Sequence, residues 1–274
     1  MIVGRGGSLL HLRQLLEGDG LRGRLDRAAV DIASIHFPAL EAEPILDQLN
    51  QLAANLGDRL RNFNDGREFV EKARLFLFQE LGFHGNEENF SDPLNSCLNQ
   101  VIERKTGIPI SLAVFYMEIA RRLQMPVYGI GLPRHFVLQF DDGRFSTYID
   151  PYGGKLLTTD ECFALAGARE ANPGLLRRVT KKQIAIRMLQ NMHLVYSQAR
   201  DYPHAIQTLD LMIVGAPEMA SWYRRRGMLL VQDHRLSDAR RDFEKYLAME
   251  PHADDREEVV KQMEQIHLRL ARVN

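Results

Sequence analysis

Three residues in the middle of the chain have the side chains that nucleophilic acyl chemistry requires. Ser111 lies at the predicted start of a helix, His135 at the predicted start of a strand, and Asp150 at the predicted end of another strand. A serine hydroxyl attacks a carbonyl when a histidine accepts its proton and a carboxylate orients that histidine. A helix dipole, worth about 0.3–1 kcal/mol, cannot produce an alkoxide without such a base. The three residues are therefore a candidate triad for acyl transfer or hydrolysis.

The histidine and the aspartate of this triad also have purely structural interpretations. His135 could bond only to the backbone, and Asp150 precedes a proline, where aspartate is a common turn residue. Tyr128 and Tyr152 could line a cleft beside them, but aromatic residues on strands more often pack in a core. Both interpretations stay open at the level of the sequence.

The elements that would position the triad form one α+β unit. Pro109 opens a helix at a first-turn position, where proline is tolerated, and Pro126 ends it. Runs rich in β-branched and aromatic residues then predict three short strands, at 127–131, 136–140 and 145–149. The helix is predicted from apolar residues at helical spacing, namely Leu112, Phe115, Tyr116, Ile119 and Leu123.

This order of elements resembles the papain-like transglutaminase core. In that fold a cysteine starts the helix, a histidine follows on a strand, and an aspartate comes about fifteen residues later, a spacing that His135 and Asp150 match. Three segments, 107–113, 132–136 and 149–151, more closely resemble the bacterial transglutaminase-like proteins with C-terminal tetratricopeptide repeats. That family, the Sir B group, is named after a regulator of invasion genes, and the resemblance runs from about Leu25 to the end of the chain.

The chain departs from this family at the nucleophile. The resemblance implies a cysteine at the start of the core helix, but an alignment without gaps from Met125-Pro126 places Pro109 there. Ser111 is the nearest residue that could act as a nucleophile. Cys97 precedes the helix by more than ten residues, on a different predicted helix, and is a weak candidate thiol.

Helical patterns flank the core on both sides, so the predicted fold class is α+β. Residues 1–20 are glycine-rich with a short helical patch at 9–16, where partial order is expected. A short helix at 94–105 would carry Asn95 and Asn99 on one face, where they bond to backbone near the core helix or form a polar surface. Further helices are predicted at 25–36, 45–60, 67–81 and 159–168.

The C-terminal part contains an internal repeat. Ala205, Leu209 and Pro217 recur thirty-four residues later as Ala239, Phe243 and Pro251, which is the period of the tetratricopeptide repeat. Helices are predicted at 181–199, 203–214, 219–232, 236–248 and 254–273; Gly227 supplies the expected small residue in the second repeat, whereas His193 replaces it in the first. The predicted domains are a transglutaminase-like domain at 1–176 and a helical repeat domain at 177–274. A generic helical bundle is the alternative.

Composition limits the classes of function. The 274 residues carry a formal net charge of −1, so no basic excess points to nucleic acid, and no apolar run is long enough for a membrane span. The sequence shows no signal peptide and no cluster of zinc ligands, so we expect a cytoplasmic protein with neither metal nor cofactor. Cys97 and Cys162 are expected to be buried and unpaired, and Arg134 and Arg121-Arg122 to be solvated.

Three functional hypotheses follow. The first is a non-catalytic, transglutaminase-like interaction or regulatory module that binds a protein or peptide through its helical repeats and remnant cleft. The alternative is an acyltransferase or hydrolase that uses Ser111, His135 and Asp150. The third is a purely structural scaffold built on the repeats.

Overall fold

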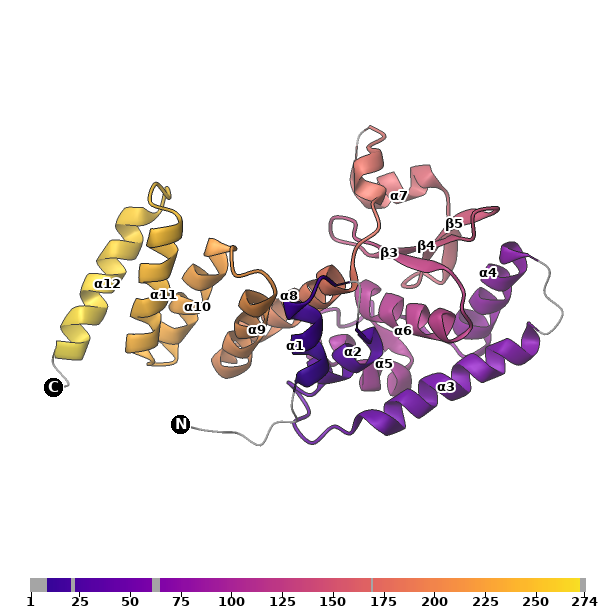
Figure 1. Ribbon diagram of the computed structural model, residues 1–274, viewed down its shortest axis with the longest axis horizontal. Helices are drawn as coiled ribbons and strands as arrows, with labels where there is room; N and C mark the ends of the chain where they lie inside the picture. Colours follow the sequence, from indigo (N-terminus) through magenta and orange to yellow (C-terminus); the bar gives the residue numbers. More distant parts are fainter. Residues whose placement is uncertain (1–8, 21–22, 61–64, 169, 272–274) are drawn as a thin grey trace. The chain divides into compact units, whose positions relative to one another are not determined.

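The computed structural model describes residues 9–20, 23–60, 65–168 and 170–271, which divide into two compact units at residues 1–188 and 189–274 (Figure 1). Residues 1–8 of the glycine-rich segment predicted at 1–20 lie outside the described residues. The two-domain division predicted from the sequence, 1–176 and 177–274, stays a prediction.

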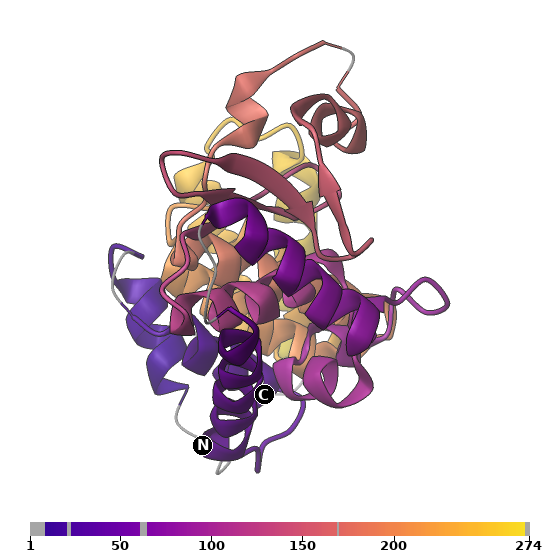
Figure 2. The ribbon, with the colours of Figure 1, turned by 90° about the vertical axis from the view of Figure 1, so that its right-hand side faces the viewer.

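Helix α6 (Pro109–Arg122) is the centre of the first unit. Residues on all its sides are buried, because the helices α2 (Leu25–Ala33), α3 (Ala42–Arg59) and α5 (Leu98–Arg104) pack against it together with the sheet. A helix that is apolar all round is one that other elements enclose. The apolar stripe predicted for this helix is therefore only part of its buried surface. Figures 1 and 2 show the sheet on one side of α6.

The sheet contains one more strand than the three that the sequence predicts. Strands β3 (Val127–Ile130), β4 (Val137–Asp141), β5 (Ser146–Asp150) and β6 (Lys155–Leu157) form an antiparallel meander in chain order. The missed strand β6 has only three residues and follows the turn at Gly153-Gly154. A second, parallel pair joins β1 (His84–Gly85) to β2 (Thr106–Gly107), just before α6. This pair places the loop after β1 beside the start of the central helix.

Two predicted helices are interrupted. The helix expected at 94–105 is a 3₁₀ turn, η2 (Pro93–Ser96), followed by α5, because Cys97 between them has extended backbone angles, with φ −93° and ψ 115°. The helix expected at 67–81 is α4 (Gly66–Arg74) followed by a π-helical turn, η1 (Leu75–Glu80). The other helices of this unit are α1 (Leu10–Glu17), α7 (Thr159–Leu165) and the short turn η3 (Pro173–Leu176).

The second unit consists of antiparallel helices at the positions that the repeat predicts. Helix α8 (Lys181–Gln198) begins in the first unit by residue number, and α9 (Tyr202–Gly215), α10 (Ala220–Gln232), α11 (Leu236–Met249) and α12 (Arg256–Ala271) follow. The repeated residues Ala205, Leu209, Ala239 and Phe243 are all completely buried. Small residues at these positions allow neighbouring helices to approach, and the larger ones fill the space between them.

Candidate functional site

Ser111 lies in the first turn of α6, and its hydroxyl is fully engaged there. The Oγ atom donates to the backbone oxygen of Asn95 at 2.6 Å and accepts from the backbone N–H of Ile108 at 3.1 Å. The residue is only 1% exposed. A hydroxyl placed in this way satisfies one of the backbone donors that a helix start leaves without a partner. The position is that of a helix cap.

His135 and Asp150 are brought together by the sheet. The His135 Nε2 atom lies 3.0 Å from Asp150 Oδ1, and the two side chains are 14% and 5% exposed. Asp150 ends β5, while His135 follows a tight turn in which its N–H donates to the oxygen of Leu132. The predicted proximity of this pair is therefore seen, and we refer to His135 and Asp150 as the dyad.

The Asp150 carboxylate is held in its ionised form. Burial alone would raise the pKa of Asp150, but the hydrogen bond and charge of His135, with backbone N–H groups of Gly153 and Tyr152, outweigh it and lower the pKa below 3.8. Tyr152 N–H donates to Oδ1 at 3.0 Å. Glycine at 153 leaves room for this carboxylate, since a Cβ atom there would lie 2.8 Å from Asp150 Oδ2 and would force a shift. The carboxylate is thus fixed by its own turn as well as by the histidine.

Arg187 on α8 fixes the loop at 132–135, which carries His135. The sequence did not predict this role of Arg187. Its Nη2 donates to the backbone oxygens of Leu132 and His135, at 2.7 Å each. Burial lowers the pKa of the Arg187 guanidinium. Arg134, at the tip of the same turn, has φ of 60° and an exposed side chain, as predicted. No pattern in the sequence marks Arg187, because its partners are backbone oxygens far away in the chain.

A series of hydrogen bonds, rather than a direct contact, lies between Ser111 and the dyad. Ser111 binds the Asn95 oxygen; Asn95 Oδ1 accepts from Asn86 Nδ2 at 2.9 Å; and the Asn86 oxygen accepts from the Tyr152 hydroxyl at 3.1 Å. The Tyr152 ring packs edge-on to the His135 ring, with centroids 6.1 Å apart. Within the described part of the chain, no hydrogen bond joins Ser111 to His135.

The two asparagines singled out from the sequence have different environments. Asn95 is completely buried, and its Nδ2 donates to the backbone oxygen of Asn89 at 2.8 Å, so the prediction of backbone bonding near the core helix is confirmed for it. Asn99 Oδ1 is buried with no partner among the described residues. The two do not share one helix face, because Cys97 separates their helices. Asn95 thus ties the loop after β1 to the start of α6.

Neither cysteine is suited to act as a nucleophile. Both are buried and unpaired, as predicted. Burial, together with the charge of Asp92, raises the pKa of the Cys97 thiol to about 12. Burial also raises the pKa of the Cys162 thiol to about 11. Because the thiolate is the reactive form, both side chains are inert at neutral pH.

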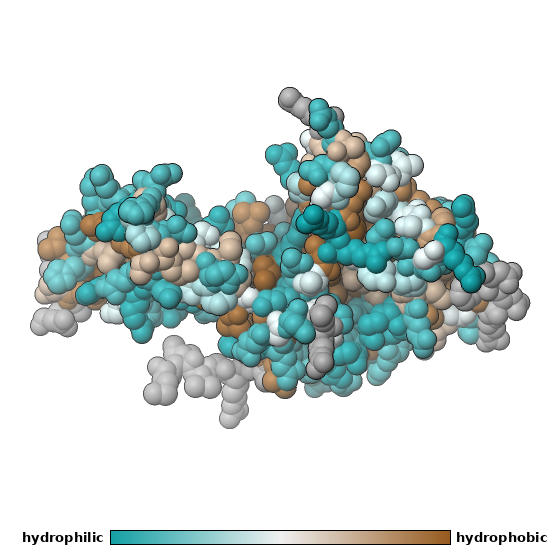
Figure 3. Space-filling view, turned by 45° about the horizontal axis from the view of Figure 1, so that its top comes forward, coloured by the Kyte–Doolittle hydropathy of each residue, from teal (hydrophilic) through white to brown (hydrophobic). Residues whose placement is uncertain are grey.

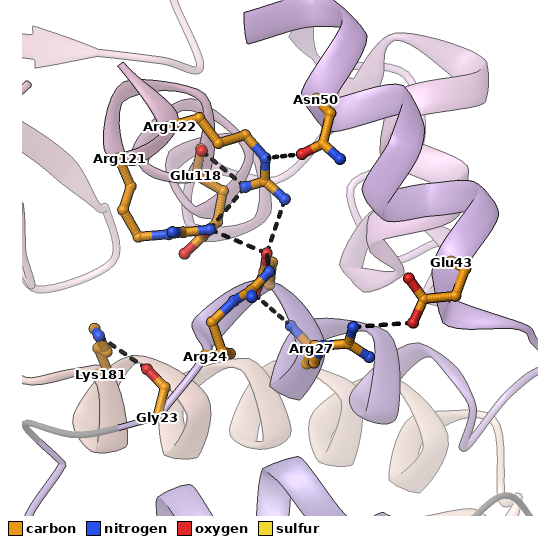
Figure 4. A network of polar contacts seen from close by, with 10 residues as sticks. Gly23, Arg24, Arg27, Glu43, Asn50, Glu118, Arg121, Arg122 and Lys181 are labelled. Carbon is orange, nitrogen blue, oxygen red and sulfur yellow. Dashed lines mark hydrogen bonds and ion pairs between the residues drawn. The ribbon is translucent and has the colours of Figure 1, made fainter. Parts of the chain in front are cut away.

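The prediction that Arg121 and Arg122 are solvated is wrong for Arg122, whereas the Arg121 side chain is 40% exposed. Arg122 is 10% exposed and donates from Nη2 to Asp26 at 2.8 Å and from Nη1 to Glu118 at 3.0 Å. Arg121 donates from Nε to Glu118 at 2.7 Å and from Nη2 to Asp26 at 3.2 Å (Figure 4). Glu118 stands three and four residues before the arginines, a spacing that places it on their face of the helix. In the sequence, this spacing was the signal that could have predicted the ion pairs between Glu118 and the two arginines.

The contact between His135 and Asp150 predicts that Asp150→Asn destabilises the fold. The asparagine offers His135 a weaker, uncharged acceptor, so we expect the unfolding free energy to fall by about 1–3 kcal/mol. Because the pKa of Asp150 is lowered in the folded protein, its ionised form stabilises the fold above pH ~3.8, and this contribution is lost as pH falls. Urea titrations at pH 7 and pH 3 test both statements. Equal stabilities of wild type and variant at pH 7 would contradict them; Asp160→Asn, on an exposed helix start, is the control.

The described residues contain neither a metal centre nor a membrane span. No group of three or more histidine, cysteine, aspartate or glutamate side chains among them could hold a metal ion. No helix in that part of the chain combines the length and apolar character that crossing a membrane needs. Figure 3 shows hydrophilic residues over most of the visible face of each unit.

Several proteins are similar to this chain in sequence. The UPF0162 protein of Xylella fastidiosa strain 9a5c is 36% identical over 187 residues, which are 64% of this chain and 66% of that protein, so the chain spans just under two thirds of this relative. The UPF0162 protein of Pseudomonas aeruginosa is 29% identical over 215 residues, 76% of this chain and 78% of that protein. Human F-box only protein 21 is 36% identical over 134 residues, 46% of this chain and 21% of that protein.

Family models match both units. Residues 193–264 match a model of the tetratricopeptide repeat. Residues 43–190, more than half of the chain, match the model described as the transglutaminase-like superfamily, and this segment contains Ser111, the dyad and all strands of the sheet. The chain therefore belongs to the transglutaminase-like superfamily, with tetratricopeptide-type helices after its transglutaminase-like domain.

Proposed function

We propose that this protein is a non-catalytic member of its superfamily, of the Sir B type, that acts in the cytoplasm as a protein-interaction or regulatory module. The single observation that carries the proposal is the state of Ser111. Its one hydroxyl proton is donated to the Asn95 backbone oxygen at 2.6 Å, and Ser111 is only 1% exposed. A serine nucleophile must instead donate that proton to a histidine and face the substrate.

The other positions that could supply a nucleophile support the same proposal. Pro109 occupies the position at which the superfamily's cysteine is expected, and proline has no attacking atom. Cys97 has a pKa raised to about 12 by burial, so its thiolate is scarce at neutral pH. His135 and Asp150 then have a structural task, which is to fix the loop at 132–135 against the turn after β5.

The features that support partner binding lie on the helical repeats and beside the dyad. Helices α10 and α12 border a groove of about 230 Å³ whose lining includes apolar side chains, amide side chains and Arg269; Met228, Gln262 and Ile266 are examples. Near the dyad, Phe90 is 54% exposed and packs edge-on to Tyr152, with ring centroids 6.4 Å apart. Such surfaces suit a peptide, because amides bond to its backbone and apolar groups cover its side chains.

One observation favours the alternative, a hydrolase or acyltransferase that uses Ser111, His135 and Asp150. The Nε2–Oδ1 distance of 3.0 Å is that of a working histidine–carboxylate pair. For catalysis, Ser111 would have to leave the Asn95 oxygen and reach His135.

Labelling with a fluorophosphonate probe separates the two functions. We expect no labelling of Ser111 in the wild type, whereas the enzyme hypothesis requires labelling that both Ser111→Ala and His135→Ala abolish. Ser111→Ala is instead expected to lower the unfolding free energy by about 1–2 kcal/mol, because it removes a helix cap. Ser146→Ala, on an exposed position of β5, is the matched control and is expected to change neither quantity. Labelling at Ser111 that depends on His135 would overturn the proposal.

A further inference from the structure

A second candidate site lies in the first unit, away from Ser111 and the dyad. It is a cavity of about 430 Å³ where the end of α6, the start of β3 and the start of α8 come together. None of its described lining residues belongs to the candidate triad. Its volume is within the range of about 300–1,000 Å³ typical of small-molecule sites. The proposed function leaves this cavity unused.

The walls of the cavity are mostly apolar. Met117 and Met125 lie on it from α6 and the turn that follows, Tyr128 from β3, and Val179 and Ile184 from the segment that enters α8. Methionine side chains are flexible and adapt to ligands of different shape. Arg178 stacks on Tyr128, 3.7 Å above the ring centroid, and so fixes that wall. The apolar part of a ligand would be held here.

The polar rim of the same cavity is positively charged. Glu118, Arg121 and Lys181 line it. Glu118 is 2% exposed, and its carboxylate is covered by both Arg121 and Arg122, so the side of the rim open to a ligand is formed by Arg121 and Lys181. Figure 4 shows Arg121 and Lys181 on the same side of the polar network.

Both cations keep hydrogen-bond donors for a ligand. Arg121 donates from Nε and Nη2 only, so its Nη1 has no partner among the described residues. Lys181 Nζ donates to the Gly23 oxygen at 2.9 Å, which uses one of its three N–H groups. The network behind the rim holds three arginines, Arg24, Arg121 and Arg122, against two carboxylates, Asp26 and Glu118, so one positive charge is left unbalanced.

We infer that this cavity binds an amphipathic monoanion, a small carboxylic acid with an apolar tail. The tail occupies the space between Met117, Met125 and Tyr128, and the carboxylate accepts hydrogen bonds from Arg121 and Lys181. An anion with no tail would lack the apolar contacts, and an apolar amine would meet cations at the rim. Recognition thus requires both ends of the ligand.

Octanoate is the probe that tests this inference in the full-length protein. Binding is followed by ¹³C-methyl NMR of the methionines, with the signals of Met117 and Met125 assigned through leucine variants. We expect octanoate to shift these two signals in a saturable manner. Octylamine and acetate, which each lack one of the two recognised features, are expected to leave them unchanged. Shifts of equal size with octylamine, or no shift with octanoate, would overturn the inference.

A pair of neighbouring lysines provides the matched variants. Lys181 lines the cavity and Lys182 does not, although both lie in the first turn of α8. Lys181→Glu is expected to raise the Kd for octanoate about tenfold, and Lys182→Glu by less than about twofold. The remaining methionine signals report that each variant is folded. Equal effects of the two substitutions would mean that only the net charge of the surface matters, and would contradict a site at Arg121 and Lys181.

Discussion

Replacing Asp26 by asparagine is expected to lower the unfolding free energy of the first unit by about 3–5 kcal/mol. Asp26 is completely buried and accepts two hydrogen bonds from Arg24, at 2.9 and 2.6 Å, and one from Arg122 at 2.8 Å. An asparagine would turn an N–H₂ group or a neutral oxygen toward these guanidinium groups. Arg122, which is only 10% exposed, would then keep its charge near the core with too little negative charge beside it, which is the costly way to break an ionic network.

The pH dependence of this effect follows from the pKa of Asp26. Burial alone would raise the pKa, but hydrogen bonds from Arg24 and Arg122 outweigh it and hold the pKa well below 3.8. A carboxyl with a lowered pKa in the folded state stabilises the fold above its unfolded pKa, and this stabilisation is lost as pH falls. Asparagine does not titrate. The difference in stability between wild type and Asp26→Asn is therefore expected to shrink progressively as pH falls below ~3.8.

Glu118 is the control within the same network. Burial, followed by the charge of Asp26, raises the pKa of Glu118 in spite of its two arginine partners. Its ionised form is thus disfavoured in the folded protein, and Glu118→Gln removes an unfavourable charge while keeping an acceptor oxygen. We expect this variant to cost less than about 1 kcal/mol. Equal losses for Asp26→Asn and Glu118→Gln would show that the placement of charge in the network does not determine stability.

The measurement has to distinguish the unfolding of the first unit from that of the second. Urea unfolding of the full-length chain is followed by circular dichroism, while fluorescence of Trp222, the sole tryptophan of the sequence, reports on the second unit. Asp26→Asn is expected to lower the urea midpoint for unfolding of the first unit, and to leave the midpoint reported by Trp222 fluorescence unchanged. Glu43→Gln breaks the exposed pair of Arg27 and Glu43 and is expected to cost less than about 1 kcal/mol.

Local patterns in the sequence predicted the elements well, because each element carries its own periodic signal. The core helix, three of the strands and the helices of the second unit were found from apolar spacing and from the prolines and glycines at their ends. The misses were short or irregular. Strand β6 has three residues, too few to show alternation, and the break at Cys97 depends on the backbone angles of one residue.

The contacts of the site were less predictable than its elements. The sequence predicted that His135 and Asp150 lie close together, because neighbouring strands must pair. It did not predict where the Ser111 proton goes, since the acceptor is a backbone oxygen and every residue has one. Arg187 and Asp26 were missed for a related reason. Their partners lie on elements that become neighbours only in the folded chain.

The second large effect is expected for Gly227→Val in the helical repeats. A Cβ atom at position 227 would lie 2.8 Å from Cε1 and 3.0 Å from Cδ1 of Phe243, closer than real contacts of this type. Phe243 is completely buried in the core between α10 and α11, so its ring has little room to move. Helix propensity alone would favour valine over glycine by roughly 0.3 kcal/mol. Overpacking opposes this gain and typically costs about 1–3 kcal/mol.

Met228→Val is the matched substitution, because it places the same β-branched residue one position along the same helix. Met228 is 40% exposed, so valine there meets no buried ring, and the expected cost is below about 0.7 kcal/mol. Trp222, on the same helix, is 5% exposed, so its fluorescence follows unfolding of this unit directly. If Gly227→Val proved as stable as Met228→Val, the close approach of α10 and α11 at Phe243 would not limit the packing of the repeat.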